Sequence, residues 1–215
     1  MRNVYSTLSA SEGYIILTWG VAHSRSLYPK LLYLSLSATS KENFVMYGMN
    51  KSELRLMPHD GAWKDDFTAE RERIETAVTD SAIRIEHIGS TAIATVWAKP
   101  VLDIAILCGA KELKAVADAL GKLGYEYRGQ YDGESGHFYA VRDSDNIRYC
   151  QAHIYTLINA DWHSKLKFRD ILCENAELAR EYNDYKLDLA QKVSNKSEYA
   201  EIKSKWVDTF ILKVL

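Results

Sequence analysis

Ile85-Glu86-His87-Ile88-Gly89-Ser90-Thr91, followed closely by Ala98-Lys99-Pro100-Val101-Leu102-Asp103, is the stretch that decides the fold. The pattern is typical of a β-strand, a Gly-Ser turn, a polar connection and a second strand that carries one acid. A turn built on Gly89 lets backbone N–H groups approach a phosphate, because glycine has no Cβ in the way. Asp103 on the neighbouring strand can hold a divalent metal against the same phosphate. A Gly-Ser-Thr tripeptide alone is more often an ordinary turn.

The composition is that of an ordinary globular protein of 215 residues, 47% hydrophobic and 26% charged. Its formal net charge of -2 gives no sign of a basic nucleic-acid surface, so no nucleic-acid partner is expected. The sequence contains no apolar run long enough to span a bilayer, and no membrane association is expected. Cys108, Cys150 and Cys173 fit no metal-ligand spacing and favour reduced thiols in a cytoplasmic protein.

Hydrophobic periodicity predicts helices and strands in a mixed order. Helices are predicted over 63–78 and 111–123, and the chain is predicted to be helical from 161 to its end. Strands are predicted over 83–88, 101–107, 125–130, 136–142 and 147–155, with turns at 132–133 and 143–146. This order predicts an α+β fold, in which a mixed β-sheet is flanked by helices and followed by a C-terminal helical segment.

Residues 1–53 differ in character from the rest of the chain. They are rich in Ser, Leu and Tyr, and Leu32, Leu34 and Leu36 alternate with other residues as in a short strand. We expect an N-terminal appendage, either an added segment or a poorly ordered tail, before a domain that spans 54–215.

Two polar side chains stand out within the predicted strands. Asp103 is the single charge in 101–107, where a carboxylate is costly unless it is paired, hydrogen-bonded or bound to a metal. It either ligates a metal or accepts backbone N–H bonds. His153 shares its strand face with Gln151 and is either a structural histidine or a functional one.

The neighbours Glu86 and His87 point to opposite faces of their strand, so only one of them can face a given pocket. A buried Glu86 needs a cationic partner, which Arg169 or Lys186 could supply. The remaining histidines show no spacing that would pair them and are expected to be surface or core residues: His23, His59, His137 and His163.

Several of these motifs together resemble the GrpB family, from about Leu54 to Leu215. They are the run from Glu86 to Thr91, the step Ala98-Lys99-Pro100, Asp103, His153, and Leu166-Lys167-Phe168-Arg169-Asp170. The C-terminal pattern also fits, through Glu181-Tyr182 with Lys186 and through Tyr199 with Lys203. The resemblance implies a nucleotidyltransferase-like fold, in which a Gly-Ser turn opens a helix and an Asp-x-Asp strand follows.

The resemblance also implies a nucleotide or another small phosphorylated molecule as the partner. The implied activity is metal-assisted nucleotidyl or phosphoryl transfer, with Asp103 as a ligand of Mg²⁺ and His153 as a further ligand or proton acceptor. The resemblance implies that phosphate is bound by Gly89, Ser90, Thr91, Lys99 and Arg169. It implies that the catalytic residues are Asp103 and His153. The supporting residues would be Glu86, Lys186 and Lys203.

The chain departs from the family pattern at two places. The family usually reads Val-Pro-Gly-Leu where this chain has Ile93-Ala94-Thr95-Val96, so this loop should differ in shape or stiffness. Position 105 is Ala, so the second acid of an Asp-x-Asp pair is missing, and a single acid would hold Mg²⁺ only weakly. The alternative is therefore a catalytically degenerate binding or accessory module for a phosphorylated metabolite or a partner enzyme. The sequence names no protein partner.

Overall fold

The computed structural model describes residues 8–11, 14–19, 30–35, 47–79, 82–131 and 136–214. They fall into two compact units that divide between Phe44 and Val45. The first unit is a three-stranded antiparallel sheet of β1 (Leu8–Ser11), β2 (Tyr14–Trp19) and β3 (Lys30–Ser35). The short strand expected around Leu32 and Leu34 is present as β3. The possibility of a poorly ordered tail stays a prediction.

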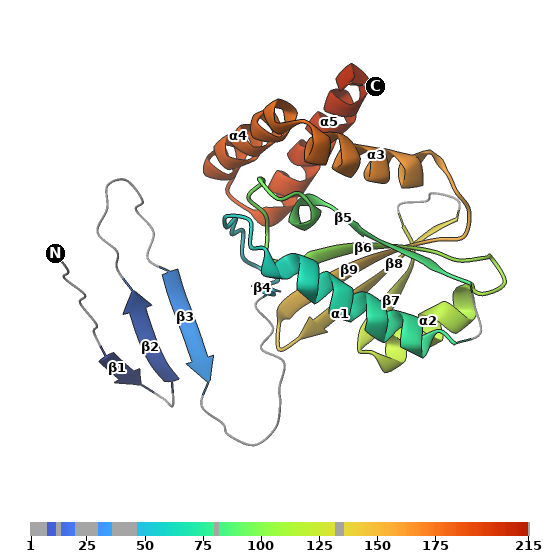
Figure 1. Cartoon of the computed structure of the whole chain (residues 1–215), viewed down its shortest axis with the longest axis horizontal. Coiled ribbons are helices and arrows are strands. Elements are labelled where there is room, and N and C mark those ends of the chain that lie inside the picture. The colour runs from blue at the N-terminus through green and yellow to red at the C-terminus, as the bar shows by residue number, and fades with distance from the viewer. Residues whose placement is uncertain are drawn as a thin grey trace. The chain divides into compact units, whose positions relative to one another are not determined.

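The second unit is built on a six-stranded mixed sheet (Figure 1). Its strands are β4 (Met49–Asn50), β5 (Arg84–Ile88), β6 (Leu102–Leu107), β7 (Tyr125–Gln130), β8 (His137–Ser144) and β9 (Ile147–Tyr155). The strand order is β5-β6-β9-β8-β7, and the short β4 pairs with the start of β9. The strands β6 and β9 are parallel, and the other pairs are antiparallel.

Five helices and one 3₁₀ turn complete the described part of this unit. They are α1 (Ala62–Ala77), η1 (Ser90–Ala92), α2 (Leu113–Lys122), α3 (Ala160–Glu174), α4 (Ala176–Lys192) and α5 (Lys196–Val214). The predicted mixed sheet with flanking helices and a helical C-terminus is confirmed. Within the described helices, none is both long enough and apolar enough to cross a membrane.

The turns between the last strands follow the expectation in part. The predicted turn at 132–133 lies outside the described residues. The next turn is narrower than predicted, because β8 continues to Ser144. The turn consists of Asp145 and Asn146, which take positive φ of 46° and 64°, as a two-residue hairpin turn between twisted strands requires.

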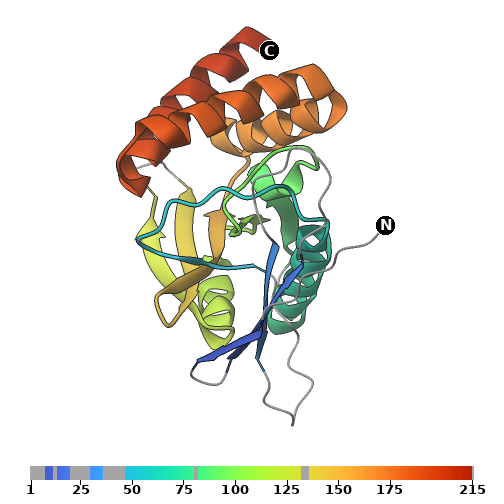
Figure 2. The same cartoon turned by 90° about the vertical axis from the view of Figure 1, so that its left-hand side faces the viewer.

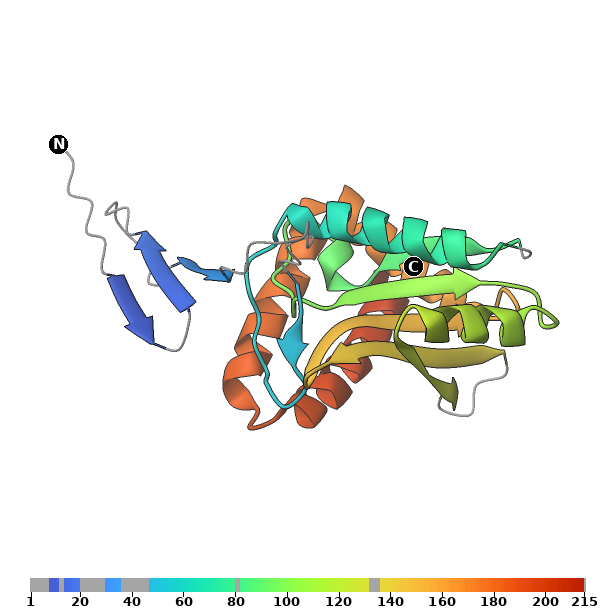
Figure 3. The same ribbon diagram turned by 90° about the horizontal axis from the view of Figure 1, so that it is seen from below.

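One face of the sheet packs against α1 and α2, which run along the strands (Figures 1 and 3). Leu102, Ile104 and Ile106 of β6 are fully buried there, against side chains that include Trp63 of α1. On the same face, the His87 ring stacks on Phe67 of α1 with the ring centroids 4.5 Å apart. These contacts give the sheet its main hydrophobic core.

The other face is covered by the C-terminal helices, which form one group (Figure 2). Trp162 of α3 packs against Ile88, Ala105 and Tyr155 of the sheet. A further cluster joins α3, α4 and α5 to the loop in which the chain departs from the family pattern, through residues that include Phe168, Tyr182, Phe210, Ile93 and Val96. This loop is therefore part of the core that positions the helices.

An ion pair ties α3 to the strand β5, and of the two cations expected as partners of Glu86, Arg169 and not Lys186 pairs with it. The Arg169 Nη1 donates to Glu86 Oε2 at 2.8 Å and to the His87 carbonyl oxygen at 2.9 Å. The two charged side chains are only 19% and 21% exposed. Burial favours the protonated form of Glu86, but hydrogen bonds from Arg169 and Arg84 outweigh it and hold the pKa of Glu86 below its ordinary value.

We expect Arg169→Ala to lower the free energy of unfolding by about 1–3 kcal/mol, because it leaves a half-buried carboxylate and a carbonyl oxygen without this donor. Urea denaturation at neutral pH measures the effect. The pKa of Glu86 is depressed in the folded state, so its contribution is complete above the ordinary glutamate pKa and disappears as the pH falls through the folded value. The difference in the free energy of unfolding between the parent and Arg169→Ala should therefore become smaller at acidic pH.

The matched control is Arg180→Ala on α4, where the side chain is 69% exposed and lies 3.9 Å from Glu177. This exposed pair should change stability by less than about 1 kcal/mol. Equal losses for the two variants would show that the ion pair does not position α3.

Candidate functional site

A cleft of about 570 Å³ lies between the sheet and the C-terminal helices. Its lining brings together most of the residues expected from the sequence: Gly89, Ser90, Thr91, Lys99, Asp103, His153, Lys186 and Lys203. Glu86 and Arg169 are not among the lining residues, and they brace β5 beside the cleft instead. Thr91 is buried, and its hydroxyl bonds to His87 Nε2 at 2.9 Å, so its side chain supports the turn.

The floor of the cleft is set by a close approach between the Gly-Ser turn and β6. Gly89 follows directly after Ile88, which pairs with Asp103 across the two strands. Gly89 has a φ of 70° and a ψ of -171°, a conformation that is almost restricted to glycine. A Cβ on Gly89 would overlap Asp103 Oδ2. The sequence prediction that the turn and the acid lie on adjacent strands is confirmed.

The Asp103 carboxylate is held by a neighbour on the next strand. Its Oδ1 accepts a hydrogen bond from Gln151 Nε2 at 2.6 Å. Burial raises the pKa of Asp103, against the hydrogen bond from Gln151 and the charges of Lys203, Lys165 and Lys99. The sequence placed Gln151 and His153 on one face but did not show that Gln151 reaches the acid.

The Gly-Ser turn is attached to α4 by a buried lysine. Lys186 is 2% exposed, and its Nζ donates to Ser90 Oγ at 2.9 Å and to the carbonyl oxygen of Trp97. The Ser90 hydroxyl also bonds to the Tyr182 hydroxyl at 3.0 Å. Burial lowers the pKa of Lys186 well below its ordinary value, and the charges of nearby lysines lower it further.

Further lysines make the cleft positive although the whole chain is slightly acidic. The described lining carries six Lys and Arg side chains against three Asp side chains. Lys99 Nζ lies 4.6 Å from the centroid of the Tyr199 ring. Burial lowers the pKa of Lys99 to about 7, with Lys203 and Lys196 adding to the effect. Lys203 differs from Lys99, because Tyr182 and Asp103 outweigh burial and raise the pKa of Lys203.

His153 has a partner that the sequence did not reveal. His137 Nε2 lies 3.0 Å from His153 Nδ1, and His137 is 1% exposed. His137 was expected to be a surface or core residue, and it is a buried one, but its place beside His153 was not predicted, since the β8–β9 register shifts by one residue between Arg142 and Asp143. This β-bulge turns His137 toward the cleft face of the sheet.

The described side chains do not form a protein-made metal site. Among the residues that the structure describes, no group of three or more His, Cys, Asp or Glu is placed to hold an ion. Ala105 is 1% exposed and packs with Trp162, so an acid at that position would be buried in an apolar cluster. Asp103 alone suits only a Mg²⁺ ion that enters already bound to phosphates.

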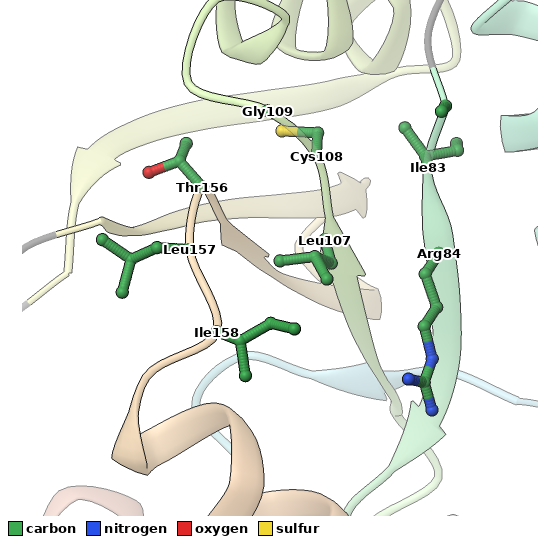
Figure 4. Close-up of a pocket in the computed structure, with 9 residues that line it drawn as sticks. Ile83, Arg84, Leu107, Cys108, Gly109, Thr156, Leu157 and Ile158 are labelled. Atoms are coloured by element: carbon green, nitrogen blue, oxygen red, sulfur yellow. The ribbon is translucent and has the colours of Figure 1, made fainter.

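A second hollow of about 480 Å³ lies at the other end of the same strands (Figure 4). Its lining is mostly apolar and includes Leu107, Cys108, Leu157 and Ile158. Its one charged side chain, Arg84, already pairs with Glu86 at 2.7 Å. This hollow therefore has fewer polar and charged groups for binding or catalysis than the lysine-lined cleft.

The comparisons with known proteins agree on one family. The sequence profile described as GrpB protein matches residues 53–213. The Glutamate-rich protein GrpB of Alkalihalophilus pseudofirmus is 33% identical over 176 residues, which cover 77% of this chain and 98% of the relative. A UPF0157 protein of Deinococcus radiodurans is 34% identical over 152 residues, covering 71% and 77%.

A solved structure supports the same fold. The crystal structure of conserved protein GrpB from Enterococcus faecalis aligns with a TM-score of 0.65 and 25% identity, covering 74% of this chain and 99% of that chain. The Cid1 poly(U) polymerase aligns at a TM-score of only 0.40 and 14% identity. The resemblance predicted from about Leu54 onward is confirmed.

We expect Gly89→Ala to destabilise the fold by about 2–4 kcal/mol, since a Cβ would meet Asp103 Oδ2 in a backbone conformation that alanine rarely adopts. Thermal and urea unfolding measure the loss.

Gly121→Ala is the control. Gly121 lies in α2, and its added Cβ would meet no atom within 4 Å. It should stabilise the protein by about 0.5–1 kcal/mol through helix propensity. A Gly89→Ala protein as stable as the parent would show that the close approach is not required.

Proposed function

The chain belongs to the GrpB family, and we propose that its cleft binds a nucleotide or another small phosphorylated molecule. The observation that carries this proposal is the buried Lys186, which holds the Ser90 turn beside Lys99 and Lys203. A phosphorylated ligand supplies the negative charge that such a cluster lacks. Lysine is a common phosphate ligand and acts as a point charge.

The energetics of the buried lysines support an anionic ligand. Burying several ammonium groups together is unfavourable, and the lowered pKa values of Lys99 and Lys186 express that cost. An anion in the cleft would favour the charged forms and recover part of the cost. The volume of the cleft suits a small molecule, and the half-buried rings of Tyr131 and Tyr139 line it as surfaces for a nucleobase.

We place binding ahead of metal-assisted nucleotidyl or phosphoryl transfer. Binding needs only the lysines and the turn, whereas two-metal chemistry needs several carboxylates. Transfer would depend on Mg²⁺ that enters with the ligand and meets Asp103. In this role the protein would hold a phosphorylated metabolite, by itself or for a partner enzyme.

We expect Lys186→Met to weaken ATP binding about tenfold or more, because it removes a buried charge that can reach the phosphates. Calorimetric titration with ATP and EDTA measures the affinity, and circular dichroism checks the fold.

The control is Lys192→Met on the same helix, where the side chain is 66% exposed and pairs with Asp188. This variant should bind ATP like the parent. Unchanged affinity in a folded Lys186→Met protein would contradict the proposal. Binding by the parent only when Mg²⁺ is present would favour the metal-assisted scheme.

The pH dependence of binding tests Lys99. Its pKa of about 7 means that the ammonium form is lost as the pH rises through neutrality. A bound phosphate favours the ammonium form, so affinity should fall over that range. Lys99→Arg keeps its charge and should not show this fall.

The measurement is the affinity for pyrophosphate of the parent and of Lys99→Arg, each as a function of pH. The ratio of the two affinities is compared, because the titration of pyrophosphate itself cancels in it. A ratio that stays constant through neutral pH would show that Lys99 does not bind the ligand.

A further inference from the structure

Two of the six cations that line the cleft differ from the other four in their contacts. Four of the six already donate to an acceptor of the protein: Lys186 to Ser90, Lys165 to Asp161, Arg148 to Asp143 and Lys196 to the Lys51 carbonyl. For Lys99 and Lys203, no hydrogen bond or ion pair is found among the residues that the structure describes. A ligand can therefore engage these two amino groups without breaking a hydrogen bond.

The backbone on both sides of Lys99 is held in place. Ala98 donates its N–H to the Met57 carbonyl at 2.9 Å and accepts from the Met57 N–H at 3.0 Å. The Pro100 carbonyl accepts from the Gly48 N–H at 2.6 Å. Both neighbours of Lys99 are also buried. The Lys99 side chain therefore lines the cleft from a fixed point of the backbone.

The surroundings of Lys99 and Lys203 favour different forms of the two amino groups. Burial lowers the pKa of Lys99 to about 7, and the charges of Lys203 and Lys196 add to this effect. Tyr182 and Asp103 raise the pKa of Lys203, which is therefore an ammonium group at neutral pH. A substantial fraction of Lys99 is then the uncharged amine. A desolvated amine beside another cation is a nucleophile for carbonyl carbons.

We propose that Lys99 forms an imine with the carbonyl carbon of a phosphorylated aldehyde, whose phosphate is held by Lys203 and the Ser90 turn. The proposal rests on the proposed function and narrows its ligand to one chemical class. The Lys99 Nζ lone pair forms a bond to the carbonyl carbon. The carbonyl oxygen leaves as water with both protons of the amine, and a C=N double bond remains. The step needs no oxidant or reductant.

The Tyr199 ring lies where it can stabilise the product. Its centroid is 4.6 Å from Lys99 Nζ, and Tyr199 is 2% exposed. A protonated imine carries a positive charge at this nitrogen, and the face of an aromatic ring attracts a cation. The contact that Lys99 makes with the ring is therefore kept when the imine forms.

Pyridoxal 5′-phosphate is the probe, because it carries both an aldehyde and a phosphate. The full chain is incubated with it at neutral pH, the imine is reduced with borohydride, and peptide mass spectrometry locates the label. We expect the label on Lys99 and little on Lys192, which is 66% exposed and pairs with Asp188. Label spread evenly over exposed lysines of the parent protein would overturn the proposal, whether or not any variant folds.

Two variants identify the reacting amine. Lys99→Arg should lose the label, because a guanidinium stays protonated and forms no imine at neutral pH. Lys192→Arg is the control and should be labelled like the parent. Labelling of folded Lys99→Arg to the same extent as the parent would overturn the assignment to Lys99.

Pyridoxal without phosphate tests the phosphate subsite. At the same concentration it should label Lys99 about tenfold less, because it lacks the group that the cations bind. Saturating pyrophosphate should protect Lys99 from pyridoxal 5′-phosphate, and Lys203→Met should reduce the preference for the phosphorylated aldehyde. Equal labelling by the two aldehydes would overturn the placing of the phosphate.

Calorimetry separates failure of this proposal from failure of the proposed function. Binding of ATP or pyrophosphate by a protein whose Lys99 is never labelled would overturn the imine and leave the proposed function intact. Failure of ATP, pyrophosphate and pyridoxal 5′-phosphate to bind would overturn the proposed function, and the imine with it.

Discussion

The site depends on the close approach of the Gly89 backbone to the Asp103 carboxylate. No other residue fits this space without moving the Asp103 side chain, because even a Cβ would overlap its carboxylate oxygen. The approach directs the chain from β5 into η1 and brings Ser90 to Lys186 on α4. Lys186 in turn joins the turn to the Trp97 carbonyl, so the loop, the sheet and the C-terminal helices share one anchoring point. The acid, the turn and the cations thus lie around one cleft because a glycine occupies one position.

Sequence reasoning located the strands and helices because their apolar periodicities are strong. It also anticipated that Glu86 needs a cation and offered Arg169 or Lys186, of which Arg169 is the partner. It could not place His137, because the β-bulge between Arg142 and Asp143 leaves no clear mark in the sequence. Without the bulge, Phe138 and not His137 would share the face of His153, because a shift of one residue exchanges the two faces of a strand.

The sequence also did not predict the surroundings of Ala105 and Lys186, and here the cause is tertiary packing. The sequence shows that residues 103 and 105 share a face, but not that Trp162 covers only the second of them. Position 105 is therefore a core position, and its small side chain allows α3 to pack. Similarly, lysines on helices are usually solvated, and only the placement of α4 against the turn buries Lys186.

The ion pair between Arg169 and Glu86 has a consequence for how molecules of this protein meet one another. In the described sheet, β5 is an edge strand that pairs only with β6, and such an edge can recruit a strand from another molecule. Arg169 donates to the carbonyl oxygen of His87 on this strand, and the charged side chains of Arg84 and Glu86 lie on the same strand. An incoming strand would have to displace a guanidinium and bury charged side chains. The contact that holds α3 in place thus also guards the sheet against edge-to-edge aggregation.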